Sequence, residues 1–178
     1  MYQISHEQLA DAAAIENLLE KCFGPDRFKK TAYKIRKPLE PVKALSLVVR
    51  EKGQLLASIR YWPVTVGEKL DALLLGPIVV EPDRQGEGIG VALIRQSLQH
   101  ARNFGCKAVI LVGDPDYYQR FGFVSAFGKG LLLPGPVEEH RFLVCELEEN
   151  ILEGIDGMVR GNPSKAHPLT AFAPPCEA

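Results

Sequence analysis

Three glycines, Gly86, Gly88 and Gly90, alternate with other residues in the segment QGEGIG. The segment follows the apolar run LLLGPIVV and precedes a stretch with helical periodicity. A loop in this position leaves the first N–H groups of the helix unpaired, at the positive end of the helix dipole. Glycine lets an anion approach such donors closely, so the spacing predicts a phosphate-binding loop. A glycine-rich turn that only packs a helix against a sheet is the alternative.

The spacing of the loop also bears on which phosphate compound it holds. A dinucleotide-binding loop needs glycine or alanine five residues after its first glycine, where this chain has Val91 (counted from Gly86) or Leu93 (counted from Gly88). A nucleotide-binding P-loop needs a Gly-Lys-Ser/Thr triplet, and none follows. The pattern therefore disfavours NAD and ATP.

The loop resembles the Q/R-x-x-G-x-G/A signature of the GNAT N-acetyltransferase superfamily through Gln85, Gly86, Glu87, Gly88, Ile89 and Gly90. A second resemblance lies downstream in DPDYYQRFGF, where Tyr118 stands four residues before Gly122. The run VGDPDYYQRFGF is similar to a little-characterised bacterial subgroup of the superfamily. The resemblance implies a GNAT fold, with splayed central strands in a mixed sheet flanked by helices, and acetyl-coenzyme A as co-substrate.

Acyl transfer from a thioester to an amine needs a neutral amine, a donor for the oxyanion and a proton for the leaving thiolate. Gly76 and Pro77 interrupt a strand and predict a bulge that frees a backbone N–H near Val79 or Val80. The resemblance implies that the backbone of Ile78 and Val80 pairs with the pantetheine arm.

The proton donor is predicted among two tyrosines. A phenol has a proton to give at neutral pH, and the resemblance implies that Tyr118 contacts the sulfur of the coenzyme. Tyr118 is therefore the candidate general acid, and Tyr117 is its rival in the same coenzyme site. Phe121 and Phe123 are expected in the core.

The general base is not identified by the pattern. The run LLLGPIVV contains no carboxylate, and the nearest acidic residues are Glu68, Asp71 and Glu81. A relay through ordered water, or an acceptor amine of low pKa, is equally compatible with the sequence.

The resemblance implies that the acceptor meets two segments, FGPDRFKK at residues 23–30 and GKGLLLPGPVEEH at residues 128–140. Arg27, Lys29 and Lys30 in the first segment suit either an acidic acceptor or the phosphates of the coenzyme. The predicted function is acetyl-coenzyme A dependent N-acetylation of a primary amine on a small molecule or protein. A non-catalytic acyl-coenzyme A sensor and an O- or longer-chain acyltransferase are the alternatives.

The elements that position these residues follow from periodicity. Apolar residues at helical spacing predict a helix that begins with a cap at Asp11 and ends at Gly24. Pro25 suits a helix entrance and Pro38 a helix end, which predicts a second, more basic helix over residues 27–36. Strand, glycine loop, helix and strand in succession predict a right-handed crossover with two parallel strands. Strands are expected at YQIS, LSLVVRE, LLASIRYWPVTV, DALLLGPIVVE, KAVILVG, LLL and RFLVCEL.

Composition limits the class of protein. With 21 basic and 22 acidic residues the net charge is −1, which disfavours nucleic acid as a partner. No signal-peptide layout and no apolar run of membrane-spanning length is seen, so a cytoplasmic protein is expected. The four cysteines and four histidines lie far apart, so no metal site is predicted.

The expected organisation is one acetyltransferase domain at residues 1–160 and a proline-rich tail at residues 161–178. The tail has no periodicity. A homodimer is kept as an option, because sheet edges can pair between chains.

Overall fold

The computed structural model describes residues 1–163, which contain nine strands and four α-helices. The strands are β1 (Gln3–His6), β2 (Leu47–Glu51), β3 (Gln54–Val66), β4 (Leu70–Val80), β5 (Ala108–Val112), β6 (Val124–Ser125), β7 (Leu131–Leu132), β8 (Phe142–Glu146) and β9 (Gly157–Gly161). The helices are α1 (Ala12–Phe23), α2 (Thr31–Arg36), α3 (Ile89–Asn103) and α4 (Pro115–Tyr118).

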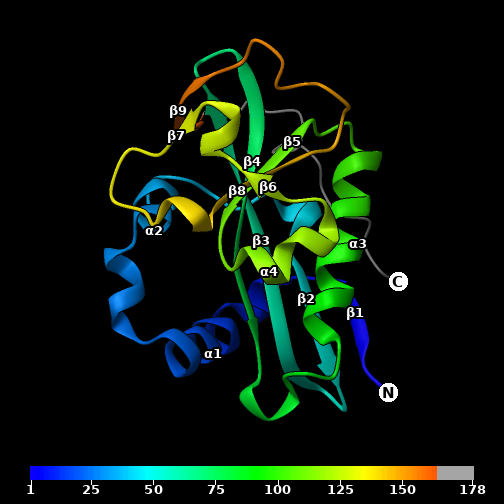
Figure 1. The fold of residues 1–178 in the computed structure, drawn as a ribbon. Coiled ribbons are helices and arrows are strands. Elements are labelled where there is room, and N and C mark those ends of the chain that lie inside the picture. The colour runs from blue at the N-terminus through cyan, green and yellow to red at the C-terminus, as the bar shows by residue number, and fades with distance from the viewer. Residues whose placement is uncertain (164–178) are drawn as a thin grey trace.

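The main sheet is mixed, with the order β1-β2-β3-β4-β5-β8-β6. Strands β1 to β4 pair antiparallel, whereas β4 and β5 pair parallel on either side of the α3 crossover. This arrangement confirms the predicted fold class and the predicted crossover. Helix α3 covers one side of the sheet, while α1 and α2 lie on the other (Figure 1).

The two sides of the sheet bury different residues of β4, as the alternation of a strand requires. Leu73 and Leu75 pack in the cluster that includes Leu93 of α3. Leu74 packs in the cluster of Ile35 on α2, and Val79 packs beside Ile15 of α1 in a third cluster. Strand β4 is therefore anchored from both sides up to its end.

The central strands separate beyond Leu74. Strand β5 pairs with β4 only at Leu73 and Leu74, although β4 continues to Val80. On the other edge of β4, Gly76 and Pro77 stand opposite the single residue Arg60 of β3, which is the predicted bulge. The indole N–H of Trp62 donates to the Gly76 carbonyl at 2.5 Å and fixes the bulge. The opening between β4 and β5 is the splay.

One prediction about the first helices is wrong, and another holds only in part. The predicted helix over residues 27–36 is a 3₁₀ segment, Pro25–Lys29, followed by α2, because Lys30 between them has extended backbone angles (φ −70°, ψ 142°). Asp11 stands at the predicted N-cap position of α1, but its side chain makes no capping hydrogen bond to this helix. Its carboxylate instead accepts the backbone N–H of Gln8 at 2.7 Å and binds Arg50, since Asp11 ends a preceding 3₁₀ turn.

Two strands that periodicity did not predict, β6 and β9, lie in the second half of the chain. Strand β9 pairs with β3 and with β7, and Gly161, the first residue of the predicted tail, stands opposite Val64 in that pairing. Residues 164–178 of the predicted tail lie outside the described residues. In the described part of the chain no helix combines the length and apolarity needed to cross a bilayer.

Candidate active site

The glycine loop runs from the end of β4 to the start of α3. Gly88 is the N-cap of α3 and, like Gly86, has a positive φ, 83° and 84° respectively. A Cβ at either position would meet no atom within 4 Å, so the space beside the loop is open. Among the described residues no group accepts a hydrogen bond from the N–H groups of residues 86–91. The loop therefore presents a row of free donors at the positive end of α3.

The side chains of the loop leave these donors uncovered. The carboxylate of Glu87 accepts two bonds from Arg84 Nε at 2.9 Å, and Arg84 also binds Glu51 at 2.9 Å. Gln85 donates its side-chain amide to the carbonyl of Val80 at 3.2 Å. The negative charge on the loop is thus paired with a guanidinium.

Gly90 connects the loop with the predicted tyrosines for a steric reason. A Cβ on Gly90 would lie 3.2 Å from Tyr117 Oη and 3.6 Å from Val80 Cγ2, with Ile78 next at 3.9 Å. The absence of a side chain lets the first turn of α3 pack directly on these three residues. The structure therefore brings Ile78, Val80, Gly90 and Tyr117 together.

The backbone at the end of β4 faces the splay at alternate residues. The N–H of Glu81 bonds to Leu56 of β3 at 2.7 Å, so Val79, two residues earlier, also faces β3. Ile78 and Val80 then direct their N–H and carbonyl groups away from β3. Of the two predicted oxyanion donors, Val80 is the one whose N–H points toward the splay.

Tyr118 lies at the end of α4, whose N-cap Asp114 accepts the N–H of Asp116 at 3.0 Å. The tyrosine is 9% exposed and packs edge-on against Tyr117, with ring centroids 5.0 Å apart. Gly113 makes this position available, because a Cβ there would lie 2.4 Å from Cε2 of the Tyr118 ring. Burial raises the pKa of Tyr118 to about 12, so the phenol keeps its proton at neutral pH.

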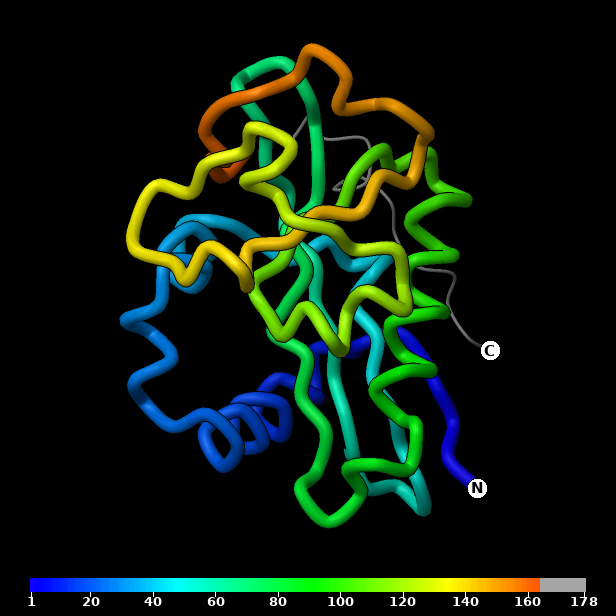
Figure 2. The backbone as a smooth tube through the Cα atoms, viewed as in Figure 1, coloured from blue at the N-terminus to red at the C-terminus, as the bar shows by residue number. Residues whose placement is uncertain are grey.

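A cavity of about 720 Å³, the main cavity, lies where the splay meets α2. It is lined by Tyr118 and by the β4 bulge at Gly76, Pro77 and Ile78. The segment between β7 and β8 runs beside α2 (Figure 2), and Thr31 Oγ1 donates to the Pro136 carbonyl at 2.6 Å across their boundary. The two segments predicted to meet the acceptor thus border one cavity.

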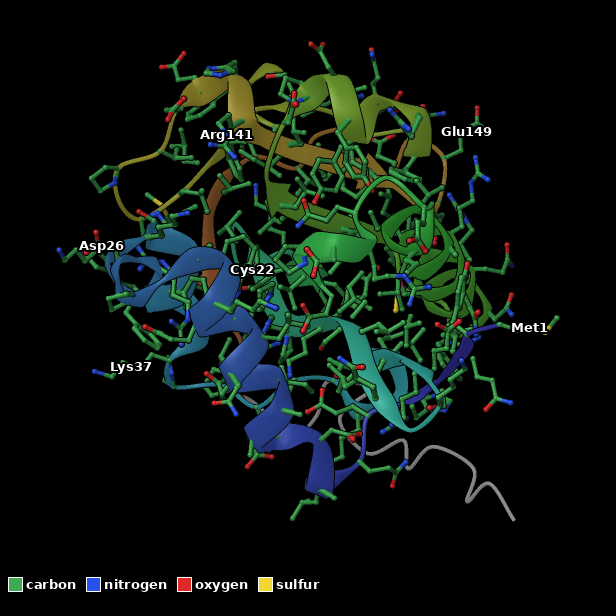
Figure 3. The ribbon with its side chains drawn as sticks, turned by 90° about the horizontal axis from the view of Figure 1, so that it is seen from below. Met1, Cys22, Asp26, Lys37, Arg141 and Glu149 are labelled. Atoms are coloured by element: carbon green, nitrogen blue, oxygen red, sulfur yellow. The ribbon has the colours of Figure 1, made fainter. Side chains whose placement is uncertain are left out.

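The charged residues of the main cavity were mostly missed by sequence reasoning. Figure 3 shows Arg141 on the part of the chain that faces α1 and α2. No local motif joins these residues, because they come from segments far apart in the sequence. The charged lining residues are Arg27, Lys30, Arg36, Asp114, Glu138 and Arg141.

The acidic residues considered as bases lie elsewhere. Glu81 binds Lys21 at 2.6 Å, and Asp71 accepts from Asn162 at 3.2 Å. Neither these two nor Glu68 lines the main cavity, whose carboxylates in the described chain are Asp114 and Glu138. Residues 1–163 contain no group of three histidine, cysteine or acidic side chains placed to hold a metal ion.

Comparisons with known proteins agree with this geometry. The model of the acetyltransferase (GNAT) family matches residues 12–123. The Escherichia coli protein named uncharacterized N-acetyltransferase YhbS is 32% identical over 151 residues, which cover 84% of this chain and 89% of that protein. The E. coli protein named uncharacterized N-acetyltransferase YjhQ is 36% identical over 140 residues, which cover 74% of this chain and 76% of that protein.

Solved structures lead to the same family. The crystal structure of E. coli YhbS in complex with CoA has a TM-score of 0.78 and covers 90% of this chain and 89% of that one. A GNAT family acetyltransferase from Brucella melitensis, solved with acetyl-CoA, is 30% identical with a TM-score of 0.66 and covers 91% of this chain and 96% of that one. The chain therefore belongs to the acetyltransferase (GNAT) family.

Proposed function

We propose that this protein transfers an acetyl group from acetyl-coenzyme A to a primary amine by direct attack of the amine on the thioester. The observation that carries the proposal is the close packing at Gly90. There the first turn of α3, which follows the free donors of the glycine loop, packs against Tyr117 and the open end of β4. The next residue, Tyr118, lines the main cavity. A phosphate seat and a buried proton donor are thus adjacent.

The residues fit coenzyme A by their donors and by their open space. The N–H groups of residues 86–91 would hold the pyrophosphate, with Gln85, Gly86, Glu87, Gly88, Ile89 and Gly90 forming the seat. The backbone groups of Ile78 and the carbonyl of Val80 would pair with the pantetheine arm as a further strand would. When bound, the co-substrate supplies the activated acetyl thioester.

Each remaining task has a candidate group on this chain. Tyr118 keeps its proton at neutral pH and would donate it to the leaving sulfur. The Val80 N–H, which points toward the splay, would stabilise the oxyanion. For the proton of the amine, Asp114 and Glu138 line the main cavity and would act directly or through water.

The proposal is tested in two steps. Thermal unfolding is measured with acetyl-coenzyme A, NAD and ATP in parallel, each at about 100 times its dissociation constant, where binding stabilises by about 2.7 kcal/mol. Release of the coenzyme A thiol is then followed over a panel of amines, and products are weighed by mass spectrometry. Stabilisation by acetyl-coenzyme A alone and an N-acetylated product are expected.

Other outcomes separate the alternatives. Stabilisation without turnover of any amine would favour an acyl-coenzyme A sensor. A product acylated on oxygen or carrying a longer chain would favour the other acyltransferases. Stabilisation by NAD or ATP instead would reject the loop assignment.

A further inference from the structure

A second cavity of about 540 Å³ lies on the other side of α2 from the main cavity, toward Trp62 and Arg60. Three residues line both cavities, namely Tyr33, Arg36 and Pro77. The wall between the cavities is therefore built from two α2 side chains and the β4 bulge. Its most polar group is the guanidinium of Arg36.

Arg36 is buried without a matching anion. It is 8% exposed, and its one hydrogen bond to the described residues runs from Nη2 to the Leu75 carbonyl at 3.5 Å. Its Nε is fully buried with no acceptor, and it forms no ion pair within residues 1–163. Burial lowers the pKa of Arg36 to about 10, which leaves the group charged at neutral pH.

Tyr33 adds a second unsatisfied group at the same place. Its ring lies 4.8 Å from the guanidinium carbon of Arg36, and its buried hydroxyl has no partner among the described residues. An anion placed beside both side chains can accept from the guanidinium and from the phenol.

Two other arginines of this region are paired with carboxylates. Arg27, 4% exposed, binds Glu20 and Glu16, and Arg60 binds both carboxylate oxygens of Glu7 at 2.6 and 2.9 Å. Arg27 and Arg60 are therefore paired with carboxylates, whereas Arg36, which borders both cavities, has no carboxylate partner among residues 1–163. Leaving a buried charge unpaired is costly, so a guanidinium without an anion among residues 1–163 points to a bound partner.

Arg36 lies next to the β4 bulge, which borders the cavity where acyl transfer is proposed. A Cβ on Gly76 would lie 2.6 Å from Arg36 Nη2, so the guanidinium rests directly against the bulge. The bulge lines the same cavity as Tyr118. An anionic group held by Arg36 and an amine that reacts beside Tyr118 would thus occupy the same cavity.

We propose that Arg36 and Tyr33 bind the carboxylate of the acceptor, and that the acceptor is a small amine bearing a carboxylate close to its amino group, as in an amino acid. This inference rests on the proposed function. The planar fork of arginine matches a carboxylate in geometry, and the phenol supplies a further donor. Lys30 and Arg141, which line the same cavity, give it an excess of positive charge.

The test compares free amino acids with the corresponding amino-acid amides as acceptors. Each pair shares its amine and side chain and differs in the carboxylate. We expect kcat/KM for the free acid to exceed that for the amide by about 10- to 100-fold, the effect of hydrogen bonds to charged groups. Arg36→Gln should abolish this preference mainly through KM, and Tyr33→Phe should reduce it. Arg36→Lys should keep part of it.

The matched control is Lys43→Gln, which removes one positive charge from an exposed side chain between α2 and β2 that lines neither cavity. The control should keep the preference for the free acid. Thermal unfolding of each variant with and without acetyl-coenzyme A shows whether it folds and binds the co-substrate.

Two results would overturn the inference while leaving the proposed function intact. One is equal acetylation of acids and amides by the unaltered protein, and the other is a preference that survives in folded Arg36→Gln. Preference for phosphorylated amines over carboxylated ones would also overturn it. Should no amine be acetylated, the proposed function fails, and calorimetry with amino acids and coenzyme A then decides: binding lost in Arg36→Gln supports the carboxylate site, and absence of binding rejects it.

Discussion

The two walls of the candidate site differ in which atoms they offer. The wall formed by the end of β4 and the glycine loop offers backbone N–H groups from residues close together in the sequence. The wall formed by α2 and the segment before β8 offers charged side chains from distant parts of the chain. The backbone donors of the first wall can therefore be predicted from one short motif, whereas the charged side chains of the second wall come together only after folding.

The difference suggests separate roles in specificity. Backbone donors bind a phosphate or an extended arm whatever the acceptor is, since they depend on local geometry rather than on side-chain type. Charged side chains discriminate among acceptors. Variants that disturb one wall should therefore leave the function of the other intact.

The strongest test of the backbone wall is Gly88→Val. The new side chain would occupy the open space beside the donors and would force valine into a left-handed conformation at φ 83°. Binding of acetyl-coenzyme A should be lost in calorimetry. Gly105→Val is the matched control, because Gly105 has φ 76° beyond the other end of α3 and equally open space. Equal loss of binding in both variants would show that strain, not the anion seat, is responsible.

Tyr118→Phe tests the proposed proton donor, which lies where the two walls meet. The variant should bind acetyl-coenzyme A with unchanged affinity and turn over about 100- to 10,000-fold more slowly, since it lacks the proton donor. Steady-state kinetics on the acceptor found in the panel measures this. Tyr117→Phe is the comparison: if it alone slows turnover, the acid is Tyr117.

Burial of the Tyr118 phenol should also appear in the pH dependence of stability. The unfolded chain releases this proton near pH 10, whereas the folded protein retains it to about pH 12. The buried, protonated phenol therefore makes its full contribution to the free energy of unfolding below pH 10, and this contribution is lost as the pH rises from 10 to 12. Between pH 9 and pH 11 the free energy of unfolding of Tyr118→Phe should therefore fall by about 1 kcal/mol less than that of the unaltered protein. Urea unfolding at both pH values measures it, and identical losses would contradict the burial.

The smallest effect is expected from the charge beside the backbone donors. Arg84→Gln would leave the Glu87 carboxylate unpaired next to the coenzyme phosphates, weakening binding by about 2- to 5-fold at low salt. High salt should remove the difference. Arg95→Gln, an exposed arginine on α3, is the control. A salt-independent loss would argue for a structural role of Arg84.

The parts of the molecule that sequence predicted are those governed by local rules. Glycine spacing located the loop and the N-terminus of α3, and Gly76-Pro77 located the bulge. The helix predicted over residues 27–36 was wrong because the flanking Pro25 and Pro38 mark only its ends, whereas the backbone becomes extended at Lys30 between them. Strand β9 was missed because its pairing partners, β3 and β7, are remote, and the charged lining of the main cavity was missed for the same reason.

The placement of Tyr118 requires a glycine at position 113 for a steric reason. The ring of Tyr118 occupies the volume that a methyl group on Gly113 would fill. Any residue other than glycine at this position would push the phenol out of its place, even with every predicted functional residue unchanged. A search for chains that hold this tyrosine in the same pose should therefore require a glycine five residues before it, in addition to the loop motif.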